Sequence, residues 1–330
     1  MPGEFSYPPA PQQSQPGDPP AYGAMPPRPP RSGKFWLFTI GGCLLGLFAL
    51  MIVTAWGISR AVTSNSSDEF GDSAQKIAVV DINGVIISAD KVNSELRKMA
   101  DKDNVKAIVL HINSPGGGAA ASQEIYNEIL RLRREKKLRF VASVESVGAS
   151  GAYYIASACD KIYANDASVV GSIGVIMEWV NYGDLMRWAK LKNVVLKAGE
   201  LKDAGNPSRD LTPKEQAYFQ SLIDNMHTQF IHDVATGRGV PEDKIKPLAT
   251  GQVWTGQQAK QLGLIDVEGG FHTAVMDTAK MVGIKGEPGI IRPPKKKISL
   301  FSALTDDADD LFPNPSNLLN QAPGFYFMWK

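Results

Sequence analysis

The chain has 330 residues, and its 35 lysines and arginines nearly balance its 34 aspartates and glutamates, for a formal net charge of +1. This length suits two average domains or one large one, and the balanced charge implies no general attraction to nucleic acid. The chain has two cysteines, Cys43 and Cys159, which are too few for a disulfide framework or a cysteine metal site.

Residues 1–34 are rich in proline, glycine, glutamine and serine and poor in branched apolar residues. A segment of this composition cannot bury enough apolar surface to order itself, so we predict a disordered tail. Its proline pairs leave open a second role as a ligand for a proline-binding domain.

Residues 35–59 contain no charged side chain and are mostly apolar. A run of about 25 residues is long enough to cross a bilayer with some tilt, whereas a cleaved secretory signal has a shorter apolar core. Arg28, Arg31 and Lys34 precede the run, and acidic residues follow it. The positive-inside rule therefore predicts a single-pass anchor in the cell membrane, with a cytoplasmic N-terminus and an extracytoplasmic catalytic domain.

A polar linker at 60–75 leads into segments that alternate between strand and helix patterns. Several predicted strands are nearly continuous in apolar residues, which favours a parallel sheet covered on both faces. The predicted strands are 77–82, 105–112, 140–143, 161–164, 173–176, 194–197 and 264–266. The predicted helices are 91–100, 119–134, 182–191, 212–237, 242–248, 255–262 and 270–282. We place one folded domain at 76–288 and a flexible C-terminal tail at 289–330.

Ser150 lies in a run of small residues, after a predicted strand and before an apolar helical stretch. A hydroxyl at a helix N-terminus faces unpaired N–H groups and the positive end of the helix dipole, both of which favour a developing anion. The same position also suits an ordinary N-cap serine. The local sequence thus makes Ser150 a candidate nucleophile and a candidate helix cap.

Three glycines, Gly116, Gly117 and Gly118, follow a predicted buried strand and precede a predicted helix. Glycines let the backbone approach a substrate closely and aim N–H groups at one point. A second N–H could come from Gly151, and two such donors would stabilise an oxyanion by several kcal/mol. Nucleotide-binding loops have a different glycine spacing, which this run does not match.

The base that would activate Ser150 is less evident. None of the four histidines falls in a small-residue context, but a Ser-His-Asp triad stays open because its members can occur in any order. A lysine can serve instead when burial favours its neutral form. Lys202, which follows Gly199 and precedes Asp203, is the candidate, with Ser172 as a hydroxyl that could orient it.

These motifs together resemble the signal peptide peptidase A family, membrane-anchored Ser/Lys proteases with the fold of Clp proteases and crotonases. The resemblance covers about residues 76–283. Its motifs stand at 113–118, 149–154, 170–176, 197–203 and 207–209, with further matches at 237–238, 256–259 and 264–269. The sequence departs from the pattern at Ala152, where the family has glycine.

The resemblance implies an α/β fold of repeated ββα units with parallel sheets, preceded by one transmembrane helix. It implies a serine endopeptidase that degrades remnant signal peptides and similar apolar peptides at the membrane surface, without a cofactor or a metal. Ser150 would be the nucleophile, Lys202 the general base and Ser172 the group that orients the lysine. Gly117 and Gly151 would form the oxyanion hole, although Gly116 is an alternative to Gly117.

The length is that of the short members of this family. The resemblance then implies a homo-octamer, a ring of about eight protomers in which the serine and lysine of one site come from adjacent subunits. The expected partners are peptide substrates and the membrane, with no nucleic acid.

Other readings stay open. A related Ser/Lys protease could cleave one specific membrane-protein partner, a crotonase-type enzyme could use the glycine amides on a thioester, and a scaffold could retain the fold without activity. The apolar C-terminus at 325–330 prompts the further hypothesis that the tail docks in the active-site groove of its own ring.

Overall fold

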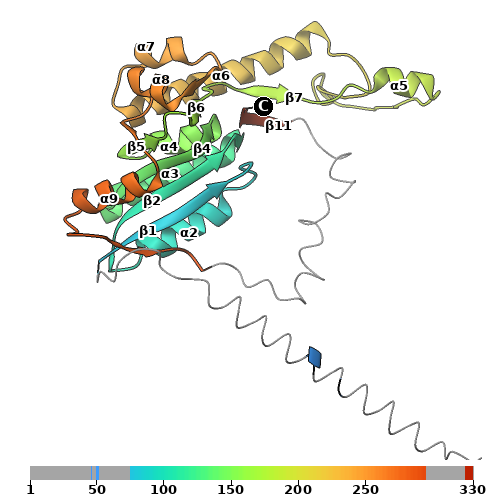
Figure 1. Ribbon diagram of the computed structural model, residues 1–330. Helices are drawn as coiled ribbons and strands as arrows, with labels where there is room; N and C mark the ends of the chain where they lie inside the picture. The colour runs from blue at the N-terminus through green and yellow to red at the C-terminus, as the bar shows by residue number, and fades with distance from the viewer. Residues whose placement is uncertain (1–45, 47–49, 52–74, 295–323, 330) are drawn as a thin grey trace, which may run out of the picture. The chain divides into compact units, whose positions relative to one another are not determined.

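The computed structural model describes residues 46, 50, 51, 75–294 and 324–329 (Figure 1). The proline-rich tail, nearly all of the predicted membrane span and most of the linker lie outside these residues. Within the described part of the chain, no helix is long and apolar enough to cross a bilayer. The chain divides into two units after Ser67, and every element named below belongs to the second unit.

A mostly parallel sheet forms the centre of this unit, with the strand order β10-β1-β2-β4-β5-β9, β6 beside β4, and β8 beside β6. Its strands are β1 (Lys76–Asn83), β2 (Val105–Ser114), β4 (Arg139–Ala149), β5 (Lys161–Ala164), β6 (Val169–Gly171), β8 (Val253–Thr255), β9 (Val267–Glu268) and β10 (Gly289–Ile291). The β6–β8 pair is antiparallel, and the other pairs of this sheet are parallel. The predicted α/β class is confirmed.

Alternate residues of the central strands pack on opposite faces of the sheet. In β1, Ala78 and Val80 belong to one apolar core, whereas Ile77 and Val79 belong to another. The first core includes residues of α2 (Asp90–Ala100), α3 (Ala119–Lys136), α4 (Gly151–Ser157) and α6 (Pro213–Arg238), and the second includes residues of α9 (Phe271–Met281). Both faces of the sheet are therefore covered, which is why its strands lack a polar face.

The long helix α6 begins where the sequence predicts. Thr212 accepts a hydrogen bond from the Glu215 N–H at 3.2 Å, and the Glu215 carboxylate accepts one from the Thr212 N–H at 2.8 Å, with Pro213 as the first helical residue. This capping box satisfies backbone donors that have no partner within the helix. Shorter helices follow at α7 (Glu242–Ile245), a 3₁₀ turn at Lys246–Leu248, and α8 (Gly256–Gln261).

An arm, residues 179–211, connects β7 (Ile176–Glu178) to α6, and Figure 1 shows α5 (Gly183–Trp188) at its far end. The strand predicted at 194–197 is wrong, since these residues have no regular structure and Leu196 is 96% exposed. The apolar run has the composition of a strand but lies on the arm, without a neighbouring strand to pair with. The strand predicted at 173–176 is also wrong, because β6 ends at Gly171, residues 172–175 have no regular structure, and β7 begins at Ile176.

Two parts of the predicted flexible tail form strands. Gly289–Ile291 is β10, which extends the main sheet beyond the predicted boundary at 288, and Ile290 is buried. The sequence pattern missed it because the apolar run is short and lies between Pro288 and Pro293. Gly324–Met328 is β11, which lies between β3 (Gly116–Gly118) and β7 in a second, smaller sheet.

Candidate active site

Ser150 occupies a strained turn between β4 and α4. Its backbone has φ 54° and ψ −117°, a conformation that costs of order 1–3 kcal/mol for a residue with a side chain. Two hydrogen bonds hold the turn, because the Ser150 N–H donates to the Gly171 carbonyl at 2.7 Å and the Tyr154 N–H donates to the Ser150 carbonyl at 2.8 Å. The Ser150 side chain makes no capping bond to α4, so the structure does not support the helix-cap reading.

Ser172 lies beside Ser150 through the pairing of two strands. Ala149, the last residue of β4, pairs with Gly171, the last residue of β6, and each serine follows one of these residues. Ser172 also has a positive φ, 51°, and its N–H donates to the Gln252 carbonyl at 2.8 Å. Both serines are buried. The structure therefore brings together the predicted nucleophile and the predicted orienting hydroxyl.

The glycine run forms β3, and Ile86 holds one of its edges. The Gly118 N–H donates to the Ile86 carbonyl at 2.7 Å, and the Ile86 N–H donates to the Gly116 carbonyl at 2.9 Å. A Cβ on Gly117 would stand 2.1 Å from the Ile86 carbonyl oxygen, closer than atoms can approach. Gly117 is thus required because another backbone passes directly over it.

The segments that carry the two predicted oxyanion donors are in contact. A Cβ on Gly116 would stand 2.7 Å from the Gly151 nitrogen, so the start of β3 and the start of α4 are in close contact. The Gly116 N–H already donates to Ser114 Oγ at 3.1 Å, which favours Gly117 over Gly116 as the second donor. At Gly151, a Cβ would stand 2.3 Å from Ser122 Oγ, which explains the glycine there.

The C-terminal strand lies against the glycine run. In the antiparallel ladder between β11 and β3, Phe327 pairs with Gly117 and Met328 pairs with Gly116. A Cβ on Gly116 would stand 2.0 Å from the Phe327 carbonyl oxygen, so this oxygen lies beside the converging glycines. The described part of the tail therefore lies against the glycine run, with the Phe327 carbonyl oxygen near Gly116 and Gly151. Sequence reasoning suggested a docked tail but named neither its register nor Phe327.

Lys202 lies elsewhere, in an exposed turn of the arm. Its backbone N–H donates to the Gly199 carbonyl at 3.2 Å. Among the described residues, no hydrogen bond or ion pair joins the Lys202 side chain to Ser150 or Ser172. Within a single copy of the chain, the predicted nucleophile Ser150 therefore lies beside the predicted supporting residue Ser172, but no hydrogen bond or ion pair among the described residues joins either to the Lys202 side chain.

A charged network holds the turn that carries Lys202. Arg209 donates to the carboxylates of Asp203 at 3.0 Å and Glu215 at 2.6 Å, and Lys197 also pairs with Asp203. Hydrogen bonds from Lys197 and Arg209 lower the pKa of Asp203. Those from Arg209 and the Thr212 N–H lower the pKa of Glu215 to about 2. Sequence reasoning quoted Asp203 and Arg209 as motif residues without seeing that they tie the lysine turn to α6.

The histidines have other surroundings. His111 lies 3.3 Å from Asp81 and packs against the ring of Phe271, and His232 pairs with the Glu242 carboxylate at 2.7 Å. The described structure therefore offers no support for a Ser-His-Asp triad around Ser150.

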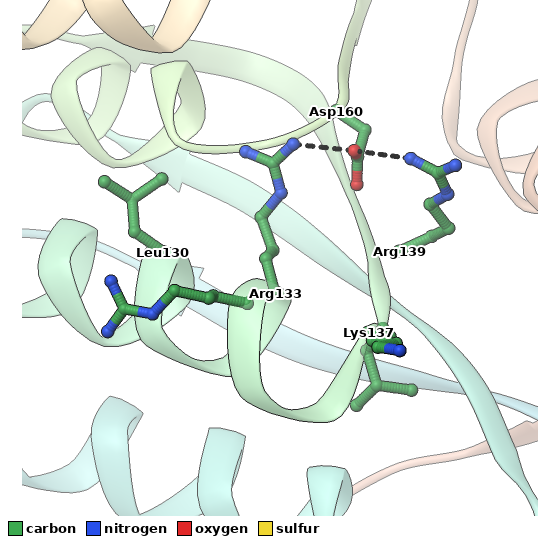
Figure 2. A pocket seen from close by; sticks show the side chains of 7 residues that line it. Leu130, Arg133, Lys137, Arg139 and Asp160 are labelled. Carbon is green, nitrogen blue, oxygen red and sulfur yellow. Dashed lines mark hydrogen bonds and ion pairs between the residues drawn. The ribbon is translucent and has the colours of Figure 1, made fainter.

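A basic pocket lies at the C-terminal end of α3 (Figure 2). Arg133 and Arg139 both pair with Asp160, at 2.7 Å and 3.1 Å, and the Phe140 N–H donates to the same carboxylate at 2.8 Å. These bonds join α3 and β4 to the turn before β5, so we assign the pocket a structural role. The residues that line it include none of the predicted catalytic ones.

Comparison with known proteins identifies the family. The model of peptidase family S49 matches residues 132–285, and that of Clp protease matches residues 75–164. A Synechocystis protein named as a protease is 37% identical over 225 residues, which cover 67% of this chain and 80% of that protein. An Enterococcus faecium protein named as signal peptide peptidase SppA is 31% identical over 235 residues, 67% of each chain. Protease 4 of Haemophilus influenzae is 32% identical over 65% of this chain and 36% of its own length. The chain therefore belongs to peptidase family S49 and is a serine-type protease that acts on peptides.

Proposed function

We propose that this protein is a membrane-anchored endopeptidase in which Ser150 is the nucleophile and Lys202 of an adjacent subunit is the general base. One observation carries the proposal: Ser150 lies in a strained turn, and Gly151 after it is in close contact with the glycine run, whereas Lys202 is exposed on the arm. The anchor is the apolar run at 35–59, and the substrates are apolar peptides at the membrane surface, such as remnant signal peptides.

The proposed reaction has two stages. Ser150 Oγ attacks the peptide carbonyl while a neutral lysine takes its proton, and the N–H groups of Gly117 and Gly151 stabilise the oxyanion. The lysine then gives the proton to the leaving amine, which departs and leaves an acyl-enzyme. Water attacks the acyl-enzyme with the same lysine as base, and Ser150 is regenerated. Ser172, beside Ser150, is placed to accept or donate a hydrogen bond that orients the lysine.

The surface of the arm supports a second copy as the missing partner. Its exposed large apolar residues are Val180, Tyr182, Leu185, Trp188, Leu191, Val194, Val195 and Leu196. A soluble surface seldom exposes so many adjacent apolar side chains, and such patches mark interaction sites. Docking this patch on a neighbour would bury it and would also desolvate a lysine on the same arm, which favours the neutral amine. Head-to-tail repetition of this contact closes a ring, for which we propose an octamer.

Complementation between two inactive variants tests the shared site. Ser150→Ala and Lys202→Ala should each abolish cleavage of an apolar reporter peptide by the full chain in detergent. Co-expression of the two in equal amounts should restore about one quarter of the wild-type activity, because that share of sites receives an intact serine and an intact lysine. Co-expression of Ser150→Ala with the double variant is the control and should restore none. Activity in Lys202→Ala alone would contradict the dyad, and a failure to restore activity would contradict the shared site.

A further inference from the structure

A basic segment spans the end of α3 and the start of β4. Residues 131–139 contain one acidic side chain, that of Glu135, and six basic ones, those of Arg131, Arg133, Arg134, Lys136, Lys137 and Arg139. Cations in the last turn of a helix interact favourably with the helix dipole, which accounts for those at the end of α3. Arg139 lies beyond the helix, as the first residue of β4, so the dipole does not account for the whole cluster.

Some of these cations hold the fold together. Arg133 and Arg139 share the carboxylate of Asp160, and Lys136 pairs with Asp101 at 2.9 Å in the turn after α2. These ion pairs join the end of α3 to the turns that precede β2 and β5. Because one aspartate compensates two arginines, the paired groups still leave this surface positive.

Other cations of the same surface have no partner within the fold. In the described part of the chain, no hydrogen bond or ion pair involves the side chain of Lys102, Arg134 or Lys137, and each of these residues is exposed. Arg134 and Lys137 line the pocket that holds the paired arginines, where Figure 2 shows Lys137. Solvated cations of this kind add little to stability, so they are available to an external anion.

These cations lie at the edge of the main sheet opposite Ser150. β1, β2, β4 and β5 are parallel, so their amino ends share one edge, which includes Arg139 and Lys161 as the first residues of β4 and β5. Ser150 follows the carboxyl end of β4, at the opposite edge (Figure 1). We call the six basic residues near the amino ends the basic edge: Lys102, Arg134, Lys136, Lys137, Arg139 and Lys161.

The chain enters the sheet at the same edge. β1 begins at Lys76, and the predicted linker at 60–75 separates it from the apolar run at 35–59. The 16 residues of this linker span at most about 55 Å when fully extended. A tether of this length holds the basic edge at a high effective concentration next to any bilayer that contains the apolar run. A bilayer is therefore the anionic surface that this edge would meet most often.

We propose that the basic edge binds the anionic headgroups of the bilayer that holds the anchor, and so turns the amino ends of the strands towards the lipid. This inference rests on the membrane anchor of the proposed function, and it adds lipid charge as the cue that orients the peptidase domain. Lysine and arginine side chains are attracted to an anionic bilayer, and about 0.1 M salt screens the attraction beyond about 10 Å. Asp101, Asp103 and Asp160 oppose the attraction, and the basic edge outnumbers them.

Lysine modification in lipid discs tests this proposal on the wild-type full chain. The discs consist of phosphatidylglycerol, which is anionic, or of phosphatidylcholine, which has no net charge. A neutral, water-soluble acylating reagent labels the exposed amines, and mass spectrometry of the digested chain gives a rate for each lysine. We expect Lys137 to be labelled at least about threefold more slowly in the anionic discs, and about 1 M salt to remove the difference. Lys91, which follows the carboxyl end of β1, is the internal control and should be labelled equally in both discs.

Charge reversal tests the electrostatic origin of this protection. Arg134→Glu should remove at least about half of the protection of Lys137, because an anionic side chain replaces a cation of the basic edge. Lys91→Glu is the matched control, since it changes the charge by the same amount at the opposite edge, and it should leave the protection intact. Neither side chain has a hydrogen bond or ion pair in the described structure, so both variants should fold and cleave the reporter peptide in detergent. Full protection of Lys137 in Arg134→Glu would overturn the proposal.

Three further outcomes would also overturn the lipid contact. The first is equal labelling of Lys137 in the two kinds of disc. The second is equal protection of Lys137 in detergent by excess glycerol phosphate, which would identify a site for small anions. The third is protection of Lys137 in detergent alone, which would identify a contact between copies of the chain.

Failure of the proposed function would look different. A chain that separates from both kinds of disc during gel filtration lacks the anchor, which contradicts the anchor and this inference together. Protection of Lys137 in a chain that does not cleave the reporter peptide would contradict the peptidase mechanism and support the lipid contact.

Discussion

Ser150 and Ser172 are neighbours because each follows the end of a strand, and those ends, Ala149 of β4 and Gly171 of β6, are paired in parallel. Both serines have a positive φ, and the Ser150 N–H donates to the carbonyl of Gly171. The ends of β4 and β6 thus place the two serines side by side, in backbone conformations that a residue with a side chain adopts only when its surroundings enforce them.

Removal of the Ser172 hydroxyl should slow the reaction without weakening substrate binding. We expect Ser172→Gly to lower kcat by about 10- to 100-fold with little change in KM, because the proposed lysine loses the group that orients it. Glycine suits the positive φ of 51° and so avoids new backbone strain. Ser157→Ala, a buried serine whose hydroxyl donates to the Tyr154 carbonyl, is the control for loss of a nearby hydroxyl. Equal kcat in Ser172→Gly and the wild type would remove Ser172 from the mechanism.

Substitution of Gly117 should disrupt the groove far more than substitution of its neighbour. A Cβ at Gly117 would stand 2.1 Å from the Ile86 carbonyl oxygen, whereas a Cβ at Gly118 would meet nothing closer than 3.6 Å. We expect Gly117→Ala to reduce kcat/KM by at least about 100-fold through displacement of an oxyanion donor, and Gly118→Ala to change it little. Similar kinetics for the two variants would show that Ile86 does not set the position of Gly117.

Arg209 should control activity without touching the substrate, through the turn that carries Lys202. Arg209→Ala leaves Asp203 and Glu215 without their shared partner, so we expect kcat to fall and KM to change little. Arg209→Lys keeps the charge but cannot bond both carboxylates with the same planar group, and should give an intermediate kcat. Steady-state kinetics on the reporter peptide measure both, and a wild-type kcat in Arg209→Ala would refute the positioning role.

Acid should destabilise the folded chain through Glu215. The pKa of the Glu215 carboxyl in the folded state is lowered from 4.5 to about 2. The hydrogen bond from Arg209 makes the largest contribution to this shift, and the hydrogen bond from the Thr212 N–H makes the next largest lowering contribution. Because the folded-state pKa is lowered, the stabilisation is complete above pH 4.5 and is lost as the pH falls from 4.5 towards 2. Urea midpoints at about pH 6 and about pH 3 should therefore differ more for the wild type than for Glu215→Gln. If the urea midpoint changes by the same amount between these two pH values in the wild type and in Glu215→Gln, other carboxylates cause the acid sensitivity.

A charge on the arm should prevent assembly. Leu196 is 96% exposed on the arm, and we expect Leu196→Asp to yield smaller particles than the wild type, with loss of peptidase activity. Leu262→Asp, at a 38% exposed leucine that follows α8, is the control and should assemble normally. Sedimentation in detergent distinguishes the species. An unchanged mass for Leu196→Asp would show that the arm is not the contact between subunits.

The sequence by itself determined the features that depend on local backbone chemistry and side-chain period. The apolar strands predicted the parallel sheet, and the pattern at Thr212 predicted the start of α6. The small residues around Ser150 predicted a turn between a strand and a helix, whereas its role as a nucleophile stays a prediction. These signals are readable because each is complete within a short stretch of chain. The missed strands β3, β8, β9, β10 and β11 are short, and β9 (Val267–Glu268) lies just after the strand predicted at 264–266. Pairing with distant segments, rather than their own sequence pattern, defines these strands.

Only the tertiary structure decided which of these features meet. Ile86 above Gly117, Ser122 against Gly151 and Phe327 in the groove are contacts between segments far apart in the chain, and no local pattern encodes them. The position of Lys202 is also a tertiary fact, because the residue lies on the arm, which carries α5 and extends away from the sheet (Figure 1). Residue types specify what chemistry a chain can perform, whereas strand pairing and packing specify which groups are close enough to perform it.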